Sequence, residues 1–139
     1  MGAALLSLSG FFVALYLWLY KQGKIGALAC GSGGCESVQL SPWSAFLGVD
    51  VALIGMVGYA VLLGIALVGL QPAHAGRRWP AQWIFWLSLG GVLFAVYLTW
   101  LEVFVIHAIC RWCVASAVII TLTCVAAWLD LRRLRAAAA

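Results

Sequence analysis

Four long apolar stretches that contain no charged residue constrain this chain more than any other feature. They are Ala3–Tyr20, Val51–Leu70, Trp79–Leu101 and Trp112–Leu129, each 18 to 23 residues long. About 20 helical residues are needed to cross the hydrocarbon core of a bilayer. Because backbone groups in lipid must be hydrogen-bonded within their own segment, each stretch predicts a helix. We place the spans at about 3–20, 51–70, 81–101 and 112–129, within one domain covering residues 1–139.

The composition agrees with a membrane environment. Apolar residues make up 66% of the chain and charged residues 9%, whereas a soluble domain carries about 25% charged residues to keep its surface hydrated. The net charge is +4, but the basic residues sit at the ends of the apolar stretches and form no stripe for nucleic acid. We therefore predict the fold class as all-α, an integral membrane four-helix bundle.

The first stretch has an alternative interpretation as a cleaved signal peptide, because Ala27–Ala29 resembles a processing site. A signal peptide has basic residues before its apolar core. Here none precede it, and Lys21 and Lys24 separate the stretch from the supposed cleavage site. We favour a retained first span.

Basic residues also indicate the orientation. Cytoplasmic loops carry an excess of Lys and Arg. With both termini in the cytoplasm, five basic residues face inward (Arg77, Arg78, Arg132, Arg133 and Arg135) and three face outward (Lys21, Lys24 and Arg111). The loop at about 21–50 then lies on the outer side. Within it we expect a short capping helix over Ser41–Gly48, with Ser41 as N-cap and Pro42 at the first helical position.

The cysteines form two pairs that this topology puts on the same outer side. Cys30 and Cys35 enclose Gly31, Ser32, Gly33 and Gly34 in the outer loop, while Cys110 and Cys113 form a C-x-x-C at the start of the last span. A fifth cysteine, Cys124, lies mid-span among apolar residues, and we interpret it as packing.

The spacing of each pair suits thiol–disulfide exchange. A C-x-x-C at a helix N-terminus places its first thiol near unpaired N–H groups, which lowers the thiol pKa, and Arg111 adds positive charge there. The glycines give the loop pair a pliable backbone. Two alternatives stay open: four cysteines could bind zinc, or could form purely structural disulfides.

In chain order the sequence has the cysteine pair Cys30 and Cys35, the V-x-x-S motif Val38–Ser41, then Gly48, Gly55 and Tyr59, and finally the segment Ala108–Cys113. This order resembles bacterial homologues of vitamin K epoxide reductase, over about Leu5 to Asp130. The other bacterial four-helix thiol oxidase has its C-x-x-C after the first span, which is the reverse order.

The resemblance implies a helical bundle around a quinone, capped by the outer loop, in a bacterial inner membrane. It implies that a separate periplasmic thioredoxin-fold (DsbA-like) protein passes electrons to Cys30, that Cys35 passes them to Cys110, and that Cys113 faces the quinone. Ser41 matches the family's loop serine. The quinone-binding candidates are Ser41, Asp50, Gly55, Tyr59, Cys113 and Ala117, and no metal is expected.

Three departures from the family pattern refine these expectations. Asp50 stands where the family usually has proline. The chain ends at Ala139 without the fused thioredoxin-like domain of many bacterial members, so a separate partner is expected. Ala117 replaces the tyrosine of animal members, which favours ubiquinone or menaquinone over vitamin K epoxide.

Four further residues have two interpretations each. Quinone reduction consumes two protons, so Glu102 and His107 could relay one; the alternative, which we favour for both, is an interfacial position in contact with headgroups or water. For Gly55 and Tyr59 we favour helix packing over contact with the quinone.

Overall fold

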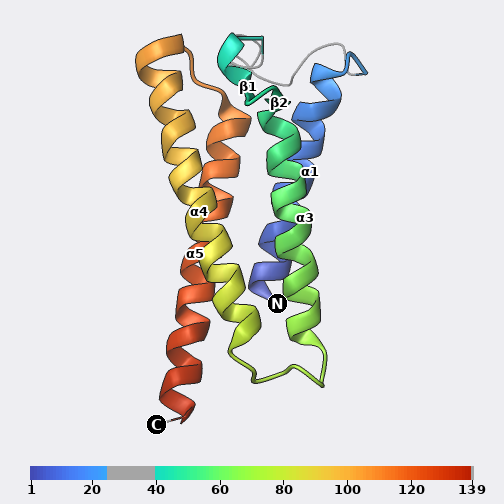
Figure 1. Cartoon of the computed structure of the whole chain (residues 1–139), viewed down its shortest axis with the longest axis vertical. Coiled ribbons are helices and arrows are strands. Elements are labelled where there is room, and N and C mark those ends of the chain that lie inside the picture. The colour runs from blue at the N-terminus through green and yellow to red at the C-terminus, as the bar shows by residue number, and fades with distance from the viewer. Residues whose placement is uncertain (25–39, 139) are drawn as a thin grey trace.

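The computed structural model describes residues 1–24 and 40–138, and four long helices dominate that part of the chain (Figure 1). They are α1 (Gly2–Lys21), α3 (Val51–Leu70), α4 (Trp79–Leu101) and α5 (Arg111–Ala138). Each is long and apolar enough to cross a membrane, and α4 continues through a π-helical turn, η2 (Glu102–Ile106). The prediction of an all-α, four-helix membrane protein is confirmed.

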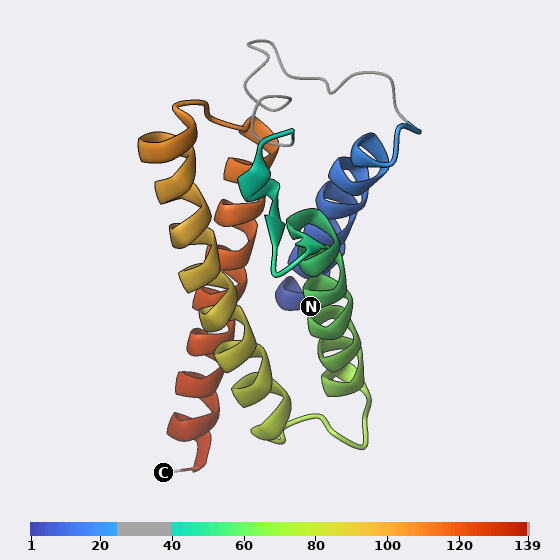
Figure 2. The same cartoon turned by 45° about the horizontal axis from the view of Figure 1, so that its top comes forward.

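The helices pack as two pairs. α1 lies against α3 and α4 lies against α5, while contacts of α1 with α5 and of α3 with α4 close the bundle (Figures 1 and 2). The two chain ends lie toward one end of the bundle with the turn between α3 and α4, and the start of α5 lies at the opposite end. The first residues of α5, which carry the C-x-x-C, are therefore far from both termini.

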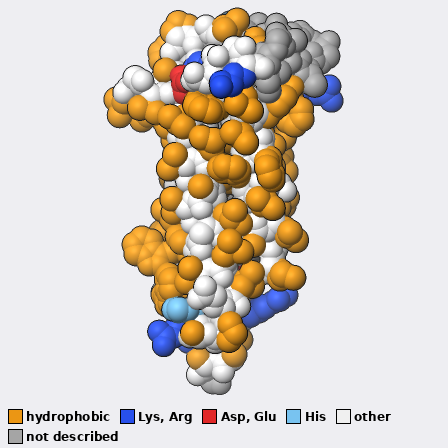
Figure 3. Space-filling view, turned by 90° about the vertical axis from the view of Figure 1, so that its right-hand side faces the viewer, with side chains coloured by type: hydrophobic (Ala, Val, Ile, Leu, Met, Phe, Trp, Pro, Cys, Tyr) orange, Lys and Arg blue, Asp and Glu red, His pale blue; other side chains and the backbone are white. Residues whose placement is uncertain are grey.

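The surface matches a lipid surrounding. On the face in Figure 3, hydrophobic side chains cover the long middle of the bundle and Lys and Arg side chains gather at its two ends. Large apolar side chains on the spans point outward, among them Phe12, Val57 and Leu93. A contiguous apolar surface of this extent is typical of contact with a membrane.

The last helix is longer than predicted. We expected its span to end at Leu129, where the charged residues begin, but α5 continues to Ala138. Arginine and alanine are strong helix formers, so the helix extends past the end of the apolar stretch. The arginine cluster thus sits on a regular helical extension of the bundle.

The capping segment differs from the predicted helix. Pro42–Ser44 form a single 3-10 turn, η1, with Ser41 before it, and a short antiparallel hairpin follows, β1 (Ala45–Phe46) and β2 (Val49–Asp50). Leu47 and Gly48 both have positive φ, 53° and 82°, as the two central residues of a type I′ hairpin turn require. Because of this turn, the segment Ser41–Gly48 does not form the helix that we predicted.

Small residues let α1 and α3 approach closely. The buried face of α1 consists of Ala4, Ser7, Gly10, Ala14 and Leu17. A side chain at Gly10 would overlap the ring of Tyr59 on α3, which packs directly over the glycine backbone. Membrane helices associate through such small residues because lipid provides no hydrophobic driving force between them.

We predict that Gly10→Ala destabilises the protein by about 1–3 kcal/mol, because the added methyl group must displace the Tyr59 ring. The matched control is Gly64→Ala, where an added Cβ meets no neighbouring atom and helix propensity favours alanine by about 1 kcal/mol. Thermal unfolding in detergent measures both. Equal stability of the two variants would contradict this packing.

Candidate active site

The side chain of Cys110 caps the N-terminus of α5. The carbonyl of Cys110 accepts the N–H of Val114 at 3.0 Å, so Cys110 occupies the N-cap position. Its Sγ accepts the backbone N–H of Cys113 at 3.3 Å, as a serine or aspartate side chain does in an ordinary cap. The first thiol of the C-x-x-C therefore points at the unpaired N–H groups of the helix.

This position changes the acidity of the Cys110 thiol. Hydrogen bonding with the Cys113 side chain lowers the pKa of Cys110 below its ordinary value, and backbone N–H groups add to this effect. Burial and the Glu102 carboxyl oppose it. We expected Arg111 to contribute positive charge, but its side chain is exposed and hydrogen bonding accounts for the shift. The Cys110 thiol is therefore more acidic than an ordinary cysteine thiol although the residue is fully buried, at 0% exposure.

Glu102 lies directly beneath the cysteine pair. Its side chain is 3% exposed, its Oε2 accepts the backbone N–H of Cys110 at 3.3 Å, and its carboxyl forms a hydrogen bond with the Cys113 thiol. The favoured interpretation, an interfacial glutamate in contact with headgroups or water, is wrong. The carboxyl is enclosed by protein.

The backbone around Glu102 explains its burial. Glu102 opens the π-helical turn η2, and its carbonyl accepts the N–H groups of both His107 and Ala108. His107 adopts the left-handed conformation, with φ 56°, which reverses the chain so that α5 starts above Glu102. π-helical turns are rare and occur frequently at functional sites. The His107 side chain is exposed and lines neither of the cavities described below.

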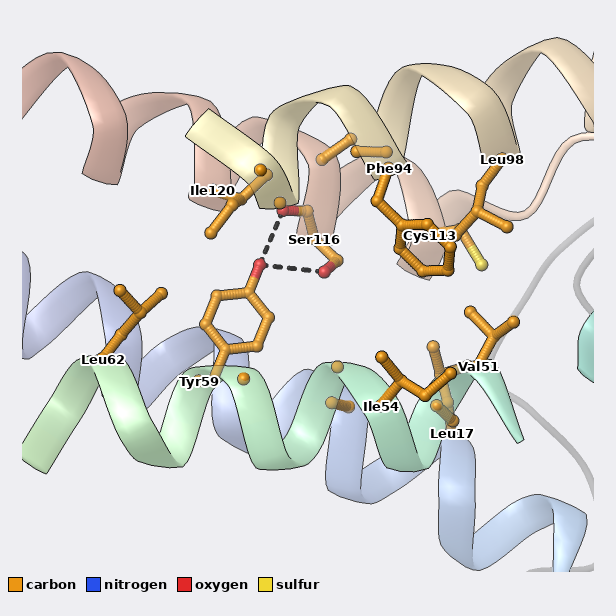
Figure 4. Close-up of a pocket in the computed structure, with 18 of the residues that line it drawn as sticks. Leu17, Val51, Ile54, Tyr59, Leu62, Phe94, Leu98, Cys113, Ser116 and Ile120 are labelled. Carbon is orange, nitrogen blue, oxygen red and sulfur yellow. Dashed lines mark hydrogen bonds between the residues drawn. The ribbon is translucent and has the colours of Figure 1, made fainter. Parts of the chain in front are cut away.

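A cavity of about 420 Å³ lies between the two helix pairs (Figure 4). Its walls are mostly apolar, with contributions from all four helices and from Glu102. Glycines on α3 and α4 leave room for it, among them Gly55 and Gly91. The polar side chains on its wall are Tyr59, Thr99, Glu102, Cys113 and Ser116. Apolar pockets of about 300–1,000 Å³ with a few directed polar groups are typical of small-molecule sites.

The cavity brings together some of the predicted quinone-binding residues and not others. Gly55, Tyr59, Cys113 and Ala117 line it, whereas Ser41 and Asp50 do not. The sulfur of Cys113 points into the gap between the helix pairs in Figure 4. Of the two predicted cysteine pairs, the one within the described residues, Cys110 and Cys113, therefore lies beside an apolar cavity.

A hydrogen bond across the cavity joins Tyr59 on α3 to α5. The Tyr59 hydroxyl lies 2.8 Å from the carbonyl oxygen of Ser116 and 3.0 Å from its Oγ (Figure 4). Ser116 was not among the predicted site residues. Its position three residues after Cys113, on the same helical face, is the sequence signal that could have identified it.

Lys21 fastens the hairpin to the end of α1. Its Nζ donates to Asp50 Oδ1 at 2.8 Å, to Ser44 Oγ at 2.7 Å and to the Ser44 carbonyl at 3.2 Å. Asp50 thus pairs with a lysine and does not use its side chain to cap α3. On the other side of the hairpin, the Phe46 ring packs on Phe94 of α4 with centroids 5.6 Å apart.

The capping segment, η1 and the hairpin, extends to Cys113. Trp43 and Ser44 line a smaller hollow of about 30 Å³ together with Glu102 and Cys113. The Lys21 contacts therefore hold the capping segment next to Cys113.

The remaining cysteines stand apart from this arrangement. Cys30 and Cys35 lie outside the described residues. Cys124 is partly buried on α5 and does not line the cavity. Across residues 1–24 and 40–138, no three His, Cys, Asp or Glu side chains gather as metal ligands would.

The chain matches the family model described as Vitamin K epoxide reductase family over residues 2–128. Because the match covers nearly the whole chain, the chain belongs to this family. It is therefore an integral membrane protein with the family's thiol–disulfide oxidoreductase chemistry.

We predict that Lys21→Met loosens the cap, because Ser44 and Asp50 lose a shared charged donor. The contacts are partly buried, so we expect a loss of about 1 kcal/mol in unfolding free energy. Chymotrypsin should also cut faster at Trp43 and Phe46. Lys24→Met is the control, since Lys24 is exposed. Identical cleavage rates in both variants would show that the Lys21 contacts do not hold the capping segment in place.

Proposed function

We propose that this member of the vitamin K epoxide reductase family transfers two electrons from the Cys110–Cys113 dithiol to a quinone bound in the cavity between the helix pairs. The observation that carries the proposal is the position of Cys113. Its sulfur borders both an apolar chamber and the cap, while Cys110 beside it is a thiol of lowered pKa.

The reaction balances within this site. Oxidation of two thiols to one disulfide breaks two S–H bonds, forms one S–S bond and releases two electrons and two protons. A quinone that accepts both electrons and both protons becomes a hydroquinone. The acidic Cys110 thiol suits exchange chemistry, since the thiolate is the species that attacks and leaves disulfides.

The cavity suits the head of a quinone. The apolar walls can contact the ring, and a volume of about 420 Å³ leaves room for the first part of an isoprenoid tail. The Tyr59 hydroxyl, held by Ser116, is a hydrogen-bond donor that can turn toward a quinone oxygen. Ala117 contributes only a methyl group to the wall, and we propose ubiquinone or menaquinone in preference to vitamin K epoxide.

The electrons reach Cys110 through the outer loop. We propose that Cys35 exchanges with Cys110 and that Cys30 exchanges with a separate periplasmic thioredoxin-fold protein, as the family resemblance implies. The segments that flank the loop, the end of α1 and η1, lie at the same end of the bundle as the start of α5 (Figure 1). This arrangement supports a short path between the two cysteine pairs.

The same end of the bundle faces the periplasm in this proposal. Arg77 and Arg78 occupy the opposite end, in the turn between α3 and α4, and the arginines on the extension of α5 occupy it too. Cytoplasmic loops are enriched in such residues. Both termini are then cytoplasmic, in a bacterial inner membrane.

We predict quinone-dependent oxidation of a reduced thioredoxin-fold substrate by the purified protein in detergent. Cys113→Ala should abolish turnover, because no disulfide can form opposite the quinone. Cys124→Ala should retain the parental rate, because this thiol does not line the cavity. If the parent fails to oxidise the substrate with either ubiquinone or menaquinone while its thiols are intact, the oxidase proposal is wrong.

A further inference from the structure

Glu102 is an ionisable side chain enclosed by protein at the end of α4, and a buried carboxylate is costly without compensation. Across the described part of the chain, Lys21 and Asp50 form an ion pair, but Glu102 has no cationic partner. Its compensation is a hydrogen bond from the backbone N–H of Cys110, together with hydrogen bonding to the Cys113 side chain. Helix packing alone would be served better by an apolar residue.

We propose that Glu102 is the acid–base residue of the quinone-reducing step, which takes the proton of the Cys113 thiol and delivers it to an oxygen of the quinone. The inference rests on the proposed function and adds a catalytic residue to it. Glu102 contacts a reacting sulfur and also lines the chamber in which the quinone would lie, so it reaches both ends of this proton transfer.

The proton and electron balance is complete with this role. The Cys113 S–H bond breaks and its proton moves to an Oε atom of Glu102. The thiolate of Cys110, whose proton has gone to solvent, supplies the second sulfur of the new S–S bond. Two electrons pass to the quinone, which takes one proton from Glu102 and one from solvent. Glu102 takes up one proton and releases one in each cycle, so it returns to its starting state.

The surroundings of Glu102 contain few competing groups. At the start of α5 it faces two titratable side chains, Cys110 at the N-cap and Cys113 in the first turn. The other walls of the hollow present neutral residues: Val51 from α3, Leu98 and Leu101 from α4, Ile106 from η2, and Trp43 and Ser44 from the cap. His107, the other candidate relay, is exposed on the turn. Tyr59, the other ionisable side chain on the wall of the larger cavity besides Glu102 and Cys113, is hydrogen-bonded to Ser116. The proposed proton path therefore runs through Glu102.

Glu102→Gln tests this role with little change in shape. The glutamine carbonyl oxygen can still accept the Cys110 N–H, but the side chain cannot carry a proton between sulfur and quinone. We expect kcat for quinone reduction to fall about 100-fold, the scale of a lost general acid–base group, with KM for quinone nearly unchanged. Glu102→Asp should recover part of the rate. Asp130→Asn, which removes an exposed carboxylate on α5, should match the parent.

A second readout needs no quinone. Thiolate absorbance near 240 nm is titrated in a protein that retains only Cys110 and Cys113, after the other three cysteines are changed to serine. Because the negative Glu102 carboxyl raises the pKa of Cys110, Glu102→Gln should form the Cys110 thiolate at lower pH than the parent.

Each result has a defined meaning. A Glu102→Gln variant with turnover within twofold of an active parent overturns the role of Glu102 and leaves the oxidase proposal intact. Equal loss in the Gln and Asp variants, with an unchanged thiol titration, identifies Glu102 as structural support and also overturns it. A parent without quinone-dependent turnover overturns the oxidase proposal, and the role of Glu102 with it.

Discussion

The N-terminus of α5 organises the rest of the site. A helix start leaves several N–H groups without partners, and here the sulfur of Cys110 accepts one of them from Cys113. The N–H of Cys110 itself is accepted by Glu102. One capping arrangement thus satisfies the backbone, lowers the pKa of a buried thiol and holds a carboxyl against the second thiol. Removing the side chain of Cys110 or of Glu102 leaves a backbone N–H without its hydrogen-bond partner in an apolar interior, which is costly.

The membrane setting explains why the polar groups of the cavity are so few and so fully engaged. Tyr59 reaches across the chamber to Ser116 on α5, and the cap is tied down by Lys21 at the edge of the bundle. Between these polar ends the walls are apolar. A substrate with an apolar body and polar oxygens complements such a chamber. The close approach of Tyr59 to Gly10 links this chamber to the packing of the bundle, so the site and the fold share residues.

The sequence predicted the features that depend on composition and local chemistry. Charge-free stretches located four spans, and the C-x-x-C was correctly expected at a helix start. Glu102 was misjudged because its burial depends on a π-helical turn and on His107 in the left-handed conformation, neither of which has a charge or hydrophobic pattern. The hairpin was missed because Leu47, 89% exposed, adopts a positive φ that leucine rarely takes. The roles of Cys30 and Cys35, outside the described residues, stay predictions.

The central claim is that Cys110 and Cys113 alone deliver electrons to the quinone. The most direct measurement is a single turnover of the reduced protein that retains only these two cysteines, mixed without oxygen with one equivalent of quinone. We expect one hydroquinone per chain, loss of both thiols and a Cys110–Cys113 disulfide detected by mass spectrometry. Retention of both thiols with the quinone unreduced would contradict the account.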